Sequence, residues 1–396
     1  MSRSATVRSV RSACRIIKRL MNCEPQGWED YRSSGREALR EILEERMQGQ
    51  LRKVLALEVA EGIRDRRNGK YRRHLLTGMG DIELSVPRTR QFSALRVVQS
   101  YARRAPDVDR AVLASFVLGL STRKVAEALL PMLGERVSAS TVSRVSRTLD
   151  EAVTAFHRRP LVNRYRVLQF DGVVLSRKTG GGAQKRPVLV VLGLLPNGRK
   201  EVIDFLLAPA ESQVAWEGFL NDLYQRGLTG EGVVQITIDG GVGLVAALSV
   251  VYPRIPVQRC WAHKVRNVLD KVREKDAPAI KKEMRRIYQA PSRGQACEHA
   301  LRLAARWEDH YPAAVRCLMK DLEELLAFFA FKDPDWRRKT RTTNAIERRF
   351  REVRRRTRPM GVFSDRTSIE RILFAVFSHE NLNQGTSTPF PLTQNS

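Results

Sequence analysis

The sequence predicts an α/β protein in which a mixed sheet flanked by helices carries an all-helical insertion and follows a mainly helical N-terminal region. Three observations support this. Apolar runs of strand length begin near residue 164, apolar residues recur at helical spacing between 263 and 336, and the same spacing occurs before residue 160. A length of 396 residues suggests about two or three domains, and a hydrophobic content of 42% suffices for packed cores.

The N-terminal region is predicted to begin with a disordered basic tail at 1–25, because its first 22 residues carry six basic side chains and no acidic one. An organelle transit peptide is the alternative for such a composition. Apolar residues at helical spacing then predict a helix or helix pair over 37–63. Two strand-like runs follow at 71–77 and 81–88, and the Gly-Met-Gly sequence between them predicts a hairpin.

A helix-turn-helix is predicted at 121–153. Ser121 is a suitable N-cap for a helix over 122–133, Gly134 would end that helix, and Ser138 can cap a second helix that runs to the end of the segment. The second helix is rich in hydroxyl and arginine side chains, which suit a DNA groove. Its predicted DNA contacts are Ser140, Thr141, Ser143 and Arg144. An ordinary packed helical hairpin explains the pattern equally well.

The region at 161–380 is predicted to contain the sheet. Its first predicted elements are strands at 167–175, 187–195 and 201–208, a helix at 213–226, a strand at 233–239, a helix at 244–251 and a strand at 256–259. Helical spacing broken by prolines then predicts an all-helical insertion at about 264–336. A basic helix from residue 344 and another over 368–377 follow, and 381–396 is predicted to be a disordered tail.

Three acidic residues lie where carboxylates can be brought to one point. Asp171 interrupts an apolar strand, Asp239 ends another, and Glu347 stands at the head of the basic helix. Proteins use carboxylates from separate elements to hold Mg²⁺ for phosphoryl chemistry, and a charge inside a strand is costly unless it is paired or bound to metal. Each acid also has another explanation. Asp-Gly at 171 and at 239 is a hairpin signal, and Asn344 with Glu347 has capping-box spacing.

The charge of the chain predicts a phosphate polymer as its partner. Lysine and arginine total 70 against 43 acidic residues, which gives a net charge of +27. Such an excess indicates binding to nucleic acid or to an anionic surface, and scattered surface charge is the alternative. The region at 26–160 is predicted to bind DNA specifically. Four arginines on the helix face of Glu347 are also predicted to contact DNA: Arg351, Arg354, Arg355 and Arg358.

The five cysteines are scattered and form no disulfide framework, which favours a reducing cytoplasm. Cys260-x-x-His263 could begin a zinc site, but no second ligand pair follows at suitable spacing. No apolar stretch of the sequence approaches the roughly 20 residues that span a bilayer, so no membrane partner is expected. The sequence also lacks a phosphate loop, a dinucleotide fingerprint and a nucleophilic triad.

Four separated motifs occur together and in a specific order. They are GDIELSVPR at 80–88, LSTRKV at 120–125, QRCWAH at 258–263 and TNAIER at 343–348. With them, the chain from about residue 67 to 381 resembles the Mutator-type bacterial insertion-sequence transposases, which belong to the Asp-Asp-Glu class. The chain departs from the family pattern at Gly241, where a more polar residue is usual, and at Phe350, where a polar residue is common.

The resemblance implies a ribonuclease H-like core in which Asp171, Asp239 and Glu347 are the catalytic residues and bind two Mg²⁺ ions, for which Mn²⁺ can substitute. It implies a DNA transposase that binds the terminal inverted repeats of its element, cuts at the element ends and joins the freed 3′-hydroxyl to another phosphodiester. Cys260 and His263 match a family motif whose role the sequence does not assign.

The partners implied by the resemblance are double-stranded DNA, from the element ends and the target, and further copies of the chain in a homodimer or larger complex. The location implied is the bacterial cytoplasm, at the nucleoid. A catalytically inactive or domesticated copy that acts as a DNA-binding regulator is one alternative. A simple nuclease with the same core is another.

Overall fold

The computed structural model describes residues 28–62, 65–90, 103–117, 120–179, 182–357 and 366–386. The described residues form two compact units, one ending at Arg147 and one beginning at Thr148. The predicted basic tail at 1–25 lies outside the described residues, as does most of the predicted tail at 381–396. Nothing among the described helices is at once long enough and apolar enough to cross a bilayer.

The first unit contains a long helix packed on a hairpin. Helix α2 (Trp28–Ala60) begins before the predicted 37, and β1 (Arg67–Thr77) pairs antiparallel with β2 (Gly80–Thr89). The predicted hairpin is confirmed, with Thr77 opposite Gly80 at the turn. Met47 of α2 packs against apolar residues of both strands, including Leu75 and Ile82, so the helix covers one face of the two-stranded sheet.

Three short helices follow in the described part of the first unit: α3 (Pro106–Val117), α4 (Thr122–Leu133) and α5 (Ala139–Ser146). The predicted caps are confirmed, since Ser121 accepts from Lys124 N, Ser138 accepts from Thr141 N, and Gly134 ends α4 with φ at 74°. The prediction that the second helix runs to 153 is wrong. It ends at Ser146, whose hydroxyl donates back to the Ser143 carbonyl, and a separate helix starts at Leu149.

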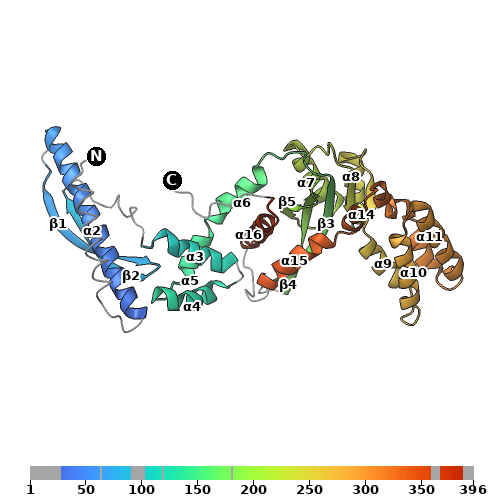
Figure 1. Ribbon diagram of the computed structural model, residues 1–396, viewed down its shortest axis with the longest axis horizontal. Coiled ribbons are helices and arrows are strands. Elements are labelled where there is room, and N and C mark those ends of the chain that lie inside the picture. The colour runs from blue at the N-terminus through green and yellow to red at the C-terminus, as the bar shows by residue number, and fades with distance from the viewer. Residues whose placement is uncertain are drawn as a thin grey trace. The chain divides into compact units, whose positions relative to one another are not determined.

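A five-stranded mixed sheet forms the centre of the second unit, which confirms the α/β prediction (Figure 1). Its strands lie in the order β5-β4-β3-β6-β7. Neighbours β3, β4 and β5 are antiparallel, whereas β6 is parallel to both β3 and β7. The strands are β3 (Val167–Thr179), β4 (Gly182–Leu194), β5 (Lys200–Leu207), β6 (Gln235–Ile238) and β7 (Val257–Arg259).

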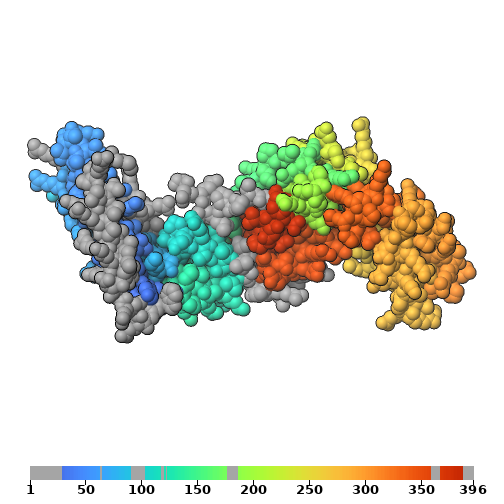
Figure 2. Space-filling model, viewed as in Figure 1, coloured from blue at the N-terminus to red at the C-terminus, as the bar shows by residue number. Residues whose placement is uncertain are grey.

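Helices cover both faces of this sheet because its side chains alternate between them. Phe170 of β3 packs against Trp216 of α7 (Gln213–Gln225), and the same cluster includes Leu244 of α8 (Val242–Val251). The opposite face contacts α6 (Leu149–Arg158), α15 (Asn344–Thr357) and α16 (Arg366–Asn383). Figure 2 shows α15 and α16 next to each other at the surface of this unit, in orange-red and red. Asp171 follows Phe170 in β3, so its side chain lies on the opposite face of the sheet, which α15 and α16 cover.

The region predicted to be an all-helical insertion is helical in the structure and has a core of its own, in which Trp261, Met284 and Phe328 are buried. Its ordered elements are α9 (Trp261–Leu269), α10 (Ala277–Gln289), α11 (Arg293–Trp307), α12 (Pro312–Met319), α13 (Leu322–Leu325), the 3₁₀ turn η2 (Ala327–Ala330) and α14 (Pro334–Thr340). The insertion starts directly after β7 and ends just before α15, so it separates the sheet from its last helices along the chain.

The prediction that a disordered tail begins at 381 is wrong for its first residues, because α16 continues to Asn383. Asn381 is buried, and its amide accepts from Val202 N at 2.8 Å and donates to Val202 O at 2.9 Å. The side chain thus pairs with β5 as a neighbouring strand would. The sequence predicted that this helix ends at 377, with its last apolar residues. Because Asn381 pairs with β5, the helix continues beyond that point.

Replacing Phe205 with alanine is expected to lower the free energy of unfolding by about 3–5 kcal/mol, the usual result of deleting a buried ring. The Phe205 ring is 1% exposed and joins β5 to the rings of Phe156, His157 and Phe377, at centroid distances of 6.0, 4.8 and 5.5 Å. Urea denaturation measures the change. Val214→Ala, at a side chain that is 78% exposed, is the control and is expected to stay within about 0.5 kcal/mol of the parent. Equal stability of the two variants would contradict this packing.

Candidate active site

Asp171 lies inside a continuous strand. It pairs with Val190 in the middle of β3, so the alternative that Asp171-Gly172 forms a hairpin turn is wrong. The residue is only 3% exposed, and its Oδ2 has no hydrogen-bond partner. Burial, followed by the charge of Asp239, raises the pKa of Asp171 to about 7, with a smaller contribution from Glu347, while His263 and Thr343 oppose the rise. His263 and Thr343 therefore compensate only part of the cost of charging this buried carboxylate.

Asp239 directly follows Ile238, the last residue of β6, which pairs with Phe170, so Asp239 lies beside Asp171 of β3. Gly240 turns the chain with φ at 101°, a conformation that favours glycine. The Arg259 guanidinium donates to Gly240 O at 2.8 Å and fills the space where a Cβ would lie. Gly241 N donates to Asp239 Oδ1 at 3.0 Å. The turn and these two bonds fix the position of the Asp239 carboxylate.

Glu347 lies in the first turn of α15 and faces the insertion. Its Oε1 is 3.7 Å from His263 Nε2 and 3.9 Å from Arg266, both in α9. The structure therefore shows Glu347 in ion pairs with another helix, and not in the capping box that its spacing from Asn344 also suggested. Both ion pairs are long, so Glu347 is held only loosely in this position.

Buried polar side chains of the sheet hold the segment that leads into α15. Gln169 of β3 donates to the carbonyls of Lys339 and Thr342 at 3.2 and 3.0 Å. Thr237 of β6 donates to Thr340 O at 2.6 Å. Gln169 and Thr237 are both fully buried. These bonds fix the segment at 339–342, which is far along the chain, against β3 and β6. These two strands lead to Asp171 and Asp239.

Cys260 and His263 connect this segment to the carboxylates. Cys260 Sγ accepts from Thr343 N at 3.3 Å and lies 3.5 Å from Thr343 Oγ1. Hydrogen bonding to Cys260 raises the pKa of His263 to about 9 against the effect of burial, and the charges of Asp171 and Asp239 add to the rise. Burial alone would raise the pKa of the Cys260 thiol, but contacts with His263 and Thr343 lower it. Cys260 thus fixes the segment before α15 through Thr343. His263 places a positive charge beside Asp171, Asp239 and Glu347.

The carboxylates suit divalent ions by chemistry, although they are not gathered around one. Within the described parts of the chain, no three His, Cys, Asp or Glu side chains stand close enough to hold a metal ion. Asp171 still presents a buried oxygen without a partner and has the charge of Asp239 nearby. Carboxylate oxygens are the ligands that Mg²⁺ prefers. Glu347 could complete the set by turning away from His263 and Arg266.

Sequence analysis missed a fourth acid at this site, Glu211. It immediately precedes Ser212, the N-cap of α7, and no pattern in the local sequence marks it. Both of its carboxylate oxygens lie over the backbone of Gly172, on the face of β3 opposite to the Asp171 side chain. Burial and then the charge of Asp239 raise the pKa of Glu211. The only sequence signal is the glycine inside β3, which often marks a close approach to a strand.

The residues predicted to contact DNA fall on two surfaces. Ser140 and Arg144 of α5 are exposed, and Thr141 and Ser143 are half-buried. The Ser138 hydroxyl bonds to both Ser140 and Thr141, so these two hydroxyls also serve the helix cap.

On α15, Arg351, Arg354 and Arg355 are exposed, whereas Arg358 lies outside the described residues. Arg355 is paired with Glu352 at 2.9 Å. Arg351 and Arg354 therefore remain the most available cations of the predicted row.

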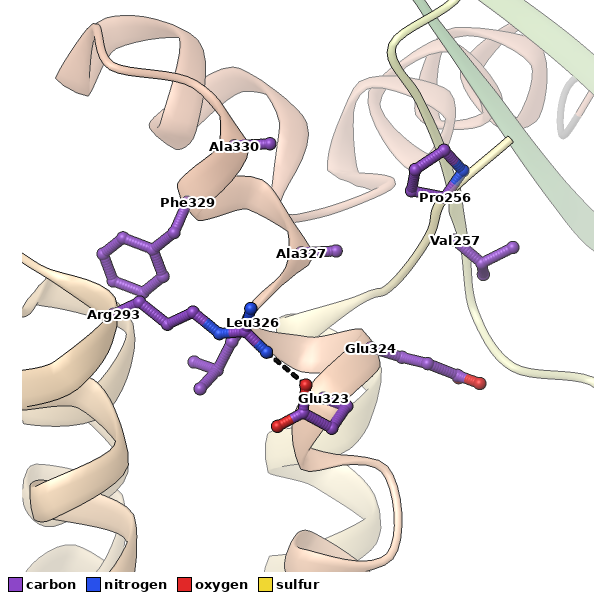
Figure 3. Close-up of a pocket in the computed structure, with 9 residues that line it drawn as sticks. All are labelled: Pro256, Val257, Arg293, Glu323, Glu324, Leu326, Ala327, Phe329 and Ala330. Carbon is purple, nitrogen blue, oxygen red and sulfur yellow. Dashed lines mark hydrogen bonds and ion pairs between the residues drawn. The ribbon is translucent and has the colours of Figure 1, made fainter. Parts of the chain in front are cut away.

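A pocket of about 530 Å³ lies elsewhere, between β7 and the insertion (Figure 3). Its wall includes Phe329, Leu326 and Pro256, and the ion pair between Arg293 and Glu323 lies beside them. None of the four carboxylates described above lines it. The candidate active site therefore lies at the end of β6, beside Asp171 of β3, and not in this pocket.

A model of the family described as "Transposase, Mutator family" matches residues 19–385 of this chain. The chain belongs to the Mutator family of transposases. Members similar to it include the transposase for insertion sequence element IS905 of Lactococcus lactis, which is 30% identical over 90% of each chain. The transposase for ISRM5 of Rhizobium meliloti is 30% identical over 94% of this chain and 92% of its own.

A third relative is the transposase for insertion sequence element IS256 in transposon Tn4001 of Staphylococcus aureus, which is 29% identical over 81% of this chain and 82% of its own. The family resemblance deduced from four short motifs is thus confirmed over most of the chain. This chain is a transposase for insertion sequence elements.

Replacing Gln169 with leucine is expected to lower transposase activity more than its effect on stability explains. The change leaves two partly buried carbonyls without their donor, which costs about 1–3 kcal/mol in unfolding free energy, and it releases the segment before Glu347. Unfolding and transposition of a marked element are measured side by side. Gln225→Leu, at an exposed position of α7, is the matched control. Full transposition with Gln169→Leu would show that the tether does not position Glu347.

Proposed function

We propose that this chain is an active Asp-Asp-Glu transposase whose five-stranded sheet is a ribonuclease H-like core, with Asp171, Asp239 and Glu347 as its catalytic residues. The observation that carries the proposal is the convergence of acids from distant segments. Phe170 pairs with Ile238, so the residues that follow them, Asp171 and Asp239, lie beside each other, and the charges of Asp239 and Glu347 both raise the pKa of Asp171. A protein gains nothing in stability from placing three anions together, so a ligand of opposite charge explains the arrangement best.

Asp171 and Asp239 would hold two Mg²⁺ or Mn²⁺ ions, and Glu347 would complete the shell of one of them. Such ions activate the attacking oxygen and stabilise the leaving oxygen of an in-line displacement. In the first step, water attacks phosphorus at the element end and the 3′-oxygen leaves as a hydroxyl. In the second, that hydroxyl attacks a target phosphodiester and displaces one of its oxygens. The carboxylates orient these groups, and no covalent bond between protein and DNA is required.

His263 and Arg266 have a second part in this proposal. They hold Glu347 by long ion pairs near the other acids, and the raised pKa of His263 keeps the imidazole protonated at neutral pH. A cation at this place reduces repulsion among the acids before ions are bound. Cys260 supports it by fixing both His263 and Thr343.

The surface beside α15 suits the backbone of DNA. Exposed Arg351 and Arg354 follow Glu347 along the helix. Burial, and then the charges of Arg349, Arg348 and Lys339, lower the pKa of Lys200 to about 8. These positive charges lie so close together that they lower the pKa of Lys200, and a bound phosphate would reduce the repulsion between them. This surface would therefore bind the element end or the target strand.

The three helices α3, α4 and α5 would recognise the terminal inverted repeats, with Ser140, Thr141, Ser143 and Arg144 at the duplex. The caps and the αL turn at Gly134 give α4 and α5 the form of a helix-turn-helix, and Arg144 is exposed on the second helix. Because two element ends are joined in one reaction, the working form would be a homodimer or larger complex on DNA. It would act in the bacterial cytoplasm, at the nucleoid.

Alanine at Asp171, Asp239 or Glu347 is expected to abolish cleavage and strand transfer while end binding stays nearly unchanged. Labelled element-end duplexes, incubated with and without Mg²⁺, separate the outcomes. Glu231→Ala removes an exposed acid before β6, at the strand end opposite Asp239, and serves as the control. Joining by the Asp239→Ala variant would refute the assignment. Cleavage by the parent protein without joining would indicate a nuclease, and metal-independent end binding alone would indicate a DNA-binding regulator.

Alanine at Arg144 is expected to weaken binding to end duplexes by about 1–3 kcal/mol and to reduce the preference for ends over random duplex. The reason is that Arg144 is the exposed cation of the second helix. Competition binding at several salt concentrations measures both effects. Arg302→Ala, at an exposed arginine of α11 in the insertion, is the matched control. An unchanged ratio of end to random binding with Arg144→Ala would show that this helix does not recognise the ends.

A further inference from the structure

We propose that the β1–β2 hairpin is a second DNA-binding surface of the first unit, at which exposed cations at its open end bind the phosphate backbone of duplex DNA. This inference rests on the proposed function, because it takes DNA as the partner of the chain. It does not depend on the carboxylates of the second unit. A bulge in the hairpin, the pairing of its charges and its attachment to α2 are the features that support it.

The bulge brings two cations of β1 to one side of the hairpin. Arg67 pairs with Thr89 and Lys70 pairs with Pro87, so β1 has one residue more than β2 between these two pairs. The extra residue reverses the alternation of side chains, and Arg67 and Lys70 therefore point to the same side although they are three positions apart. Gly69, within the bulge, has φ at 70°, a conformation that favours glycine.

This side of the hairpin is the one that faces away from α2, the helix that runs along the two strands in Figure 1. Tyr71 and Leu75 pack with Met47 of α2, and Lys70 alternates with them along β1, so it lies on the opposite face. Arg67 and Lys70 are both exposed. A two-stranded ribbon is narrow enough to enter the major groove of B-DNA, where it is flanked by phosphates.

The charges near the turn of the hairpin are paired, whereas those at its open end are not. Arg72 lies 3.1 Å from Glu83, and His74 Nδ1 lies 2.6 Å from Asp81. Five exposed cations at the open end have no ion pair among the residues that the structure describes: Arg66, Arg67, Lys70, Arg88 and Arg90. The phosphates of a duplex would supply the negative charge that the protein itself does not place here.

The backbone that carries these cations is held firmly. Asp65 Oδ1 accepts from the backbone N–H groups of Arg66 and Arg90, at 2.7 and 3.1 Å, and so joins the ends of the two strands. Across the bulge, the Arg88 side chain donates from Nε to Asn68 O at 3.0 Å. A cation on a fixed backbone loses less conformational freedom when it binds a phosphate.

Helix α2 also connects the hairpin to the predicted helix-turn-helix. Its Arg36 donates to Met79 O in the hairpin turn at 3.3 Å, and its Arg32 donates to Pro131 O of α4 at 2.9 Å. The 11 residues of β1 then lead away from this turn over about 33 Å. This length is close to one helical turn of B-DNA, about 34 Å. The open end would therefore contact phosphates outside the base pairs that α5 would read.

Such contacts would add affinity without sequence preference, because phosphates carry no direct sequence information. The hairpin would hold any duplex, and the choice of the element ends would remain with α5. The two surfaces can therefore be separated by measurement. Loss of hairpin cations lowers affinity for every duplex and weakens its salt dependence, whereas loss of a base-reading residue lowers the preference for ends.

Equilibrium binding of the full-length chain to a random-sequence duplex and to an element-end duplex tests the proposal. Arg67→Gln combined with Lys70→Gln is expected to weaken binding to both duplexes by about 10-fold and to reduce the slope of log affinity against log salt by about 2, since two phosphate contacts are lost. Fluorescence anisotropy in EDTA at several salt concentrations measures both quantities. Lys281→Gln combined with Lys282→Gln removes the same charge at exposed positions of α10 and is the matched control, expected to bind as the parent does.

Arg67→Lys combined with Lys70→Arg keeps both charges and is expected to stay within about threefold of the parent affinity. Parental affinity and salt dependence in the double Gln variant would overturn the proposal, as would an equal loss in the control. An altered ratio of end to random binding in that variant would also overturn it, since the hairpin would then read sequence. Thermal melting confirms that both Gln variants are folded. Because EDTA removes divalent ions, failure of the catalytic assignment would leave these results unchanged.

Discussion

The burial of the Asp171 carboxylate is the constraint on which this structure depends. A charge in an apolar strand is costly unless it is compensated, and here the largest charge acting on it is that of another acid, Asp239. Surface water cannot hydrate a residue that is 3% exposed, so the compensation comes from His263 and Thr343. The site is therefore destabilised by repulsion, and the remainder of the second unit has to hold the acids in place against it.

Two kinds of contact supply that rigidity. The turn after β6 is fixed by Gly240 and by Arg259, which also pairs with Glu324 of the insertion. The segment before α15 is fixed by donors from Gln169 and Thr237, which lie inside the sheet. These contacts hold the segment that leads to Glu347 against the strands β3 and β6, although a long insertion separates it from Asp239 along the chain. The insertion leaves and returns at one place, where Trp261 N donates to Arg341 O at 3.0 Å.

Much of this architecture could be predicted from the sequence, because strands, caps and helices follow local patterns. The spacing of apolar residues predicted the sheet and the helical insertion, and Ser121, Gly134 and Ser138 predicted the boundaries of α4 and the start of α5. The site was harder to predict. Asp171-Gly172 has the form of a turn, and only pairing with β4 shows that it is strand. Glu211 was missed because its position near Gly172 and Gly241 depends on tertiary packing, which no local pattern encodes.

Thr343 shows how the separate parts of the site act on each other. Its backbone N–H donates to Cys260 Sγ, its side chain lowers the pKa of Asp171 by hydrogen bonding, and its carbonyl accepts from Ile346 N at the start of α15. One residue thus touches the Cys-x-x-His motif, the buried acid and the helix of Glu347. Since it is fully buried, it cannot shift alone. A change in the charge of Asp171 would therefore be felt at α15 through this residue, which gives the Cys260 and His263 motif a structural reason to lie beside the three acids.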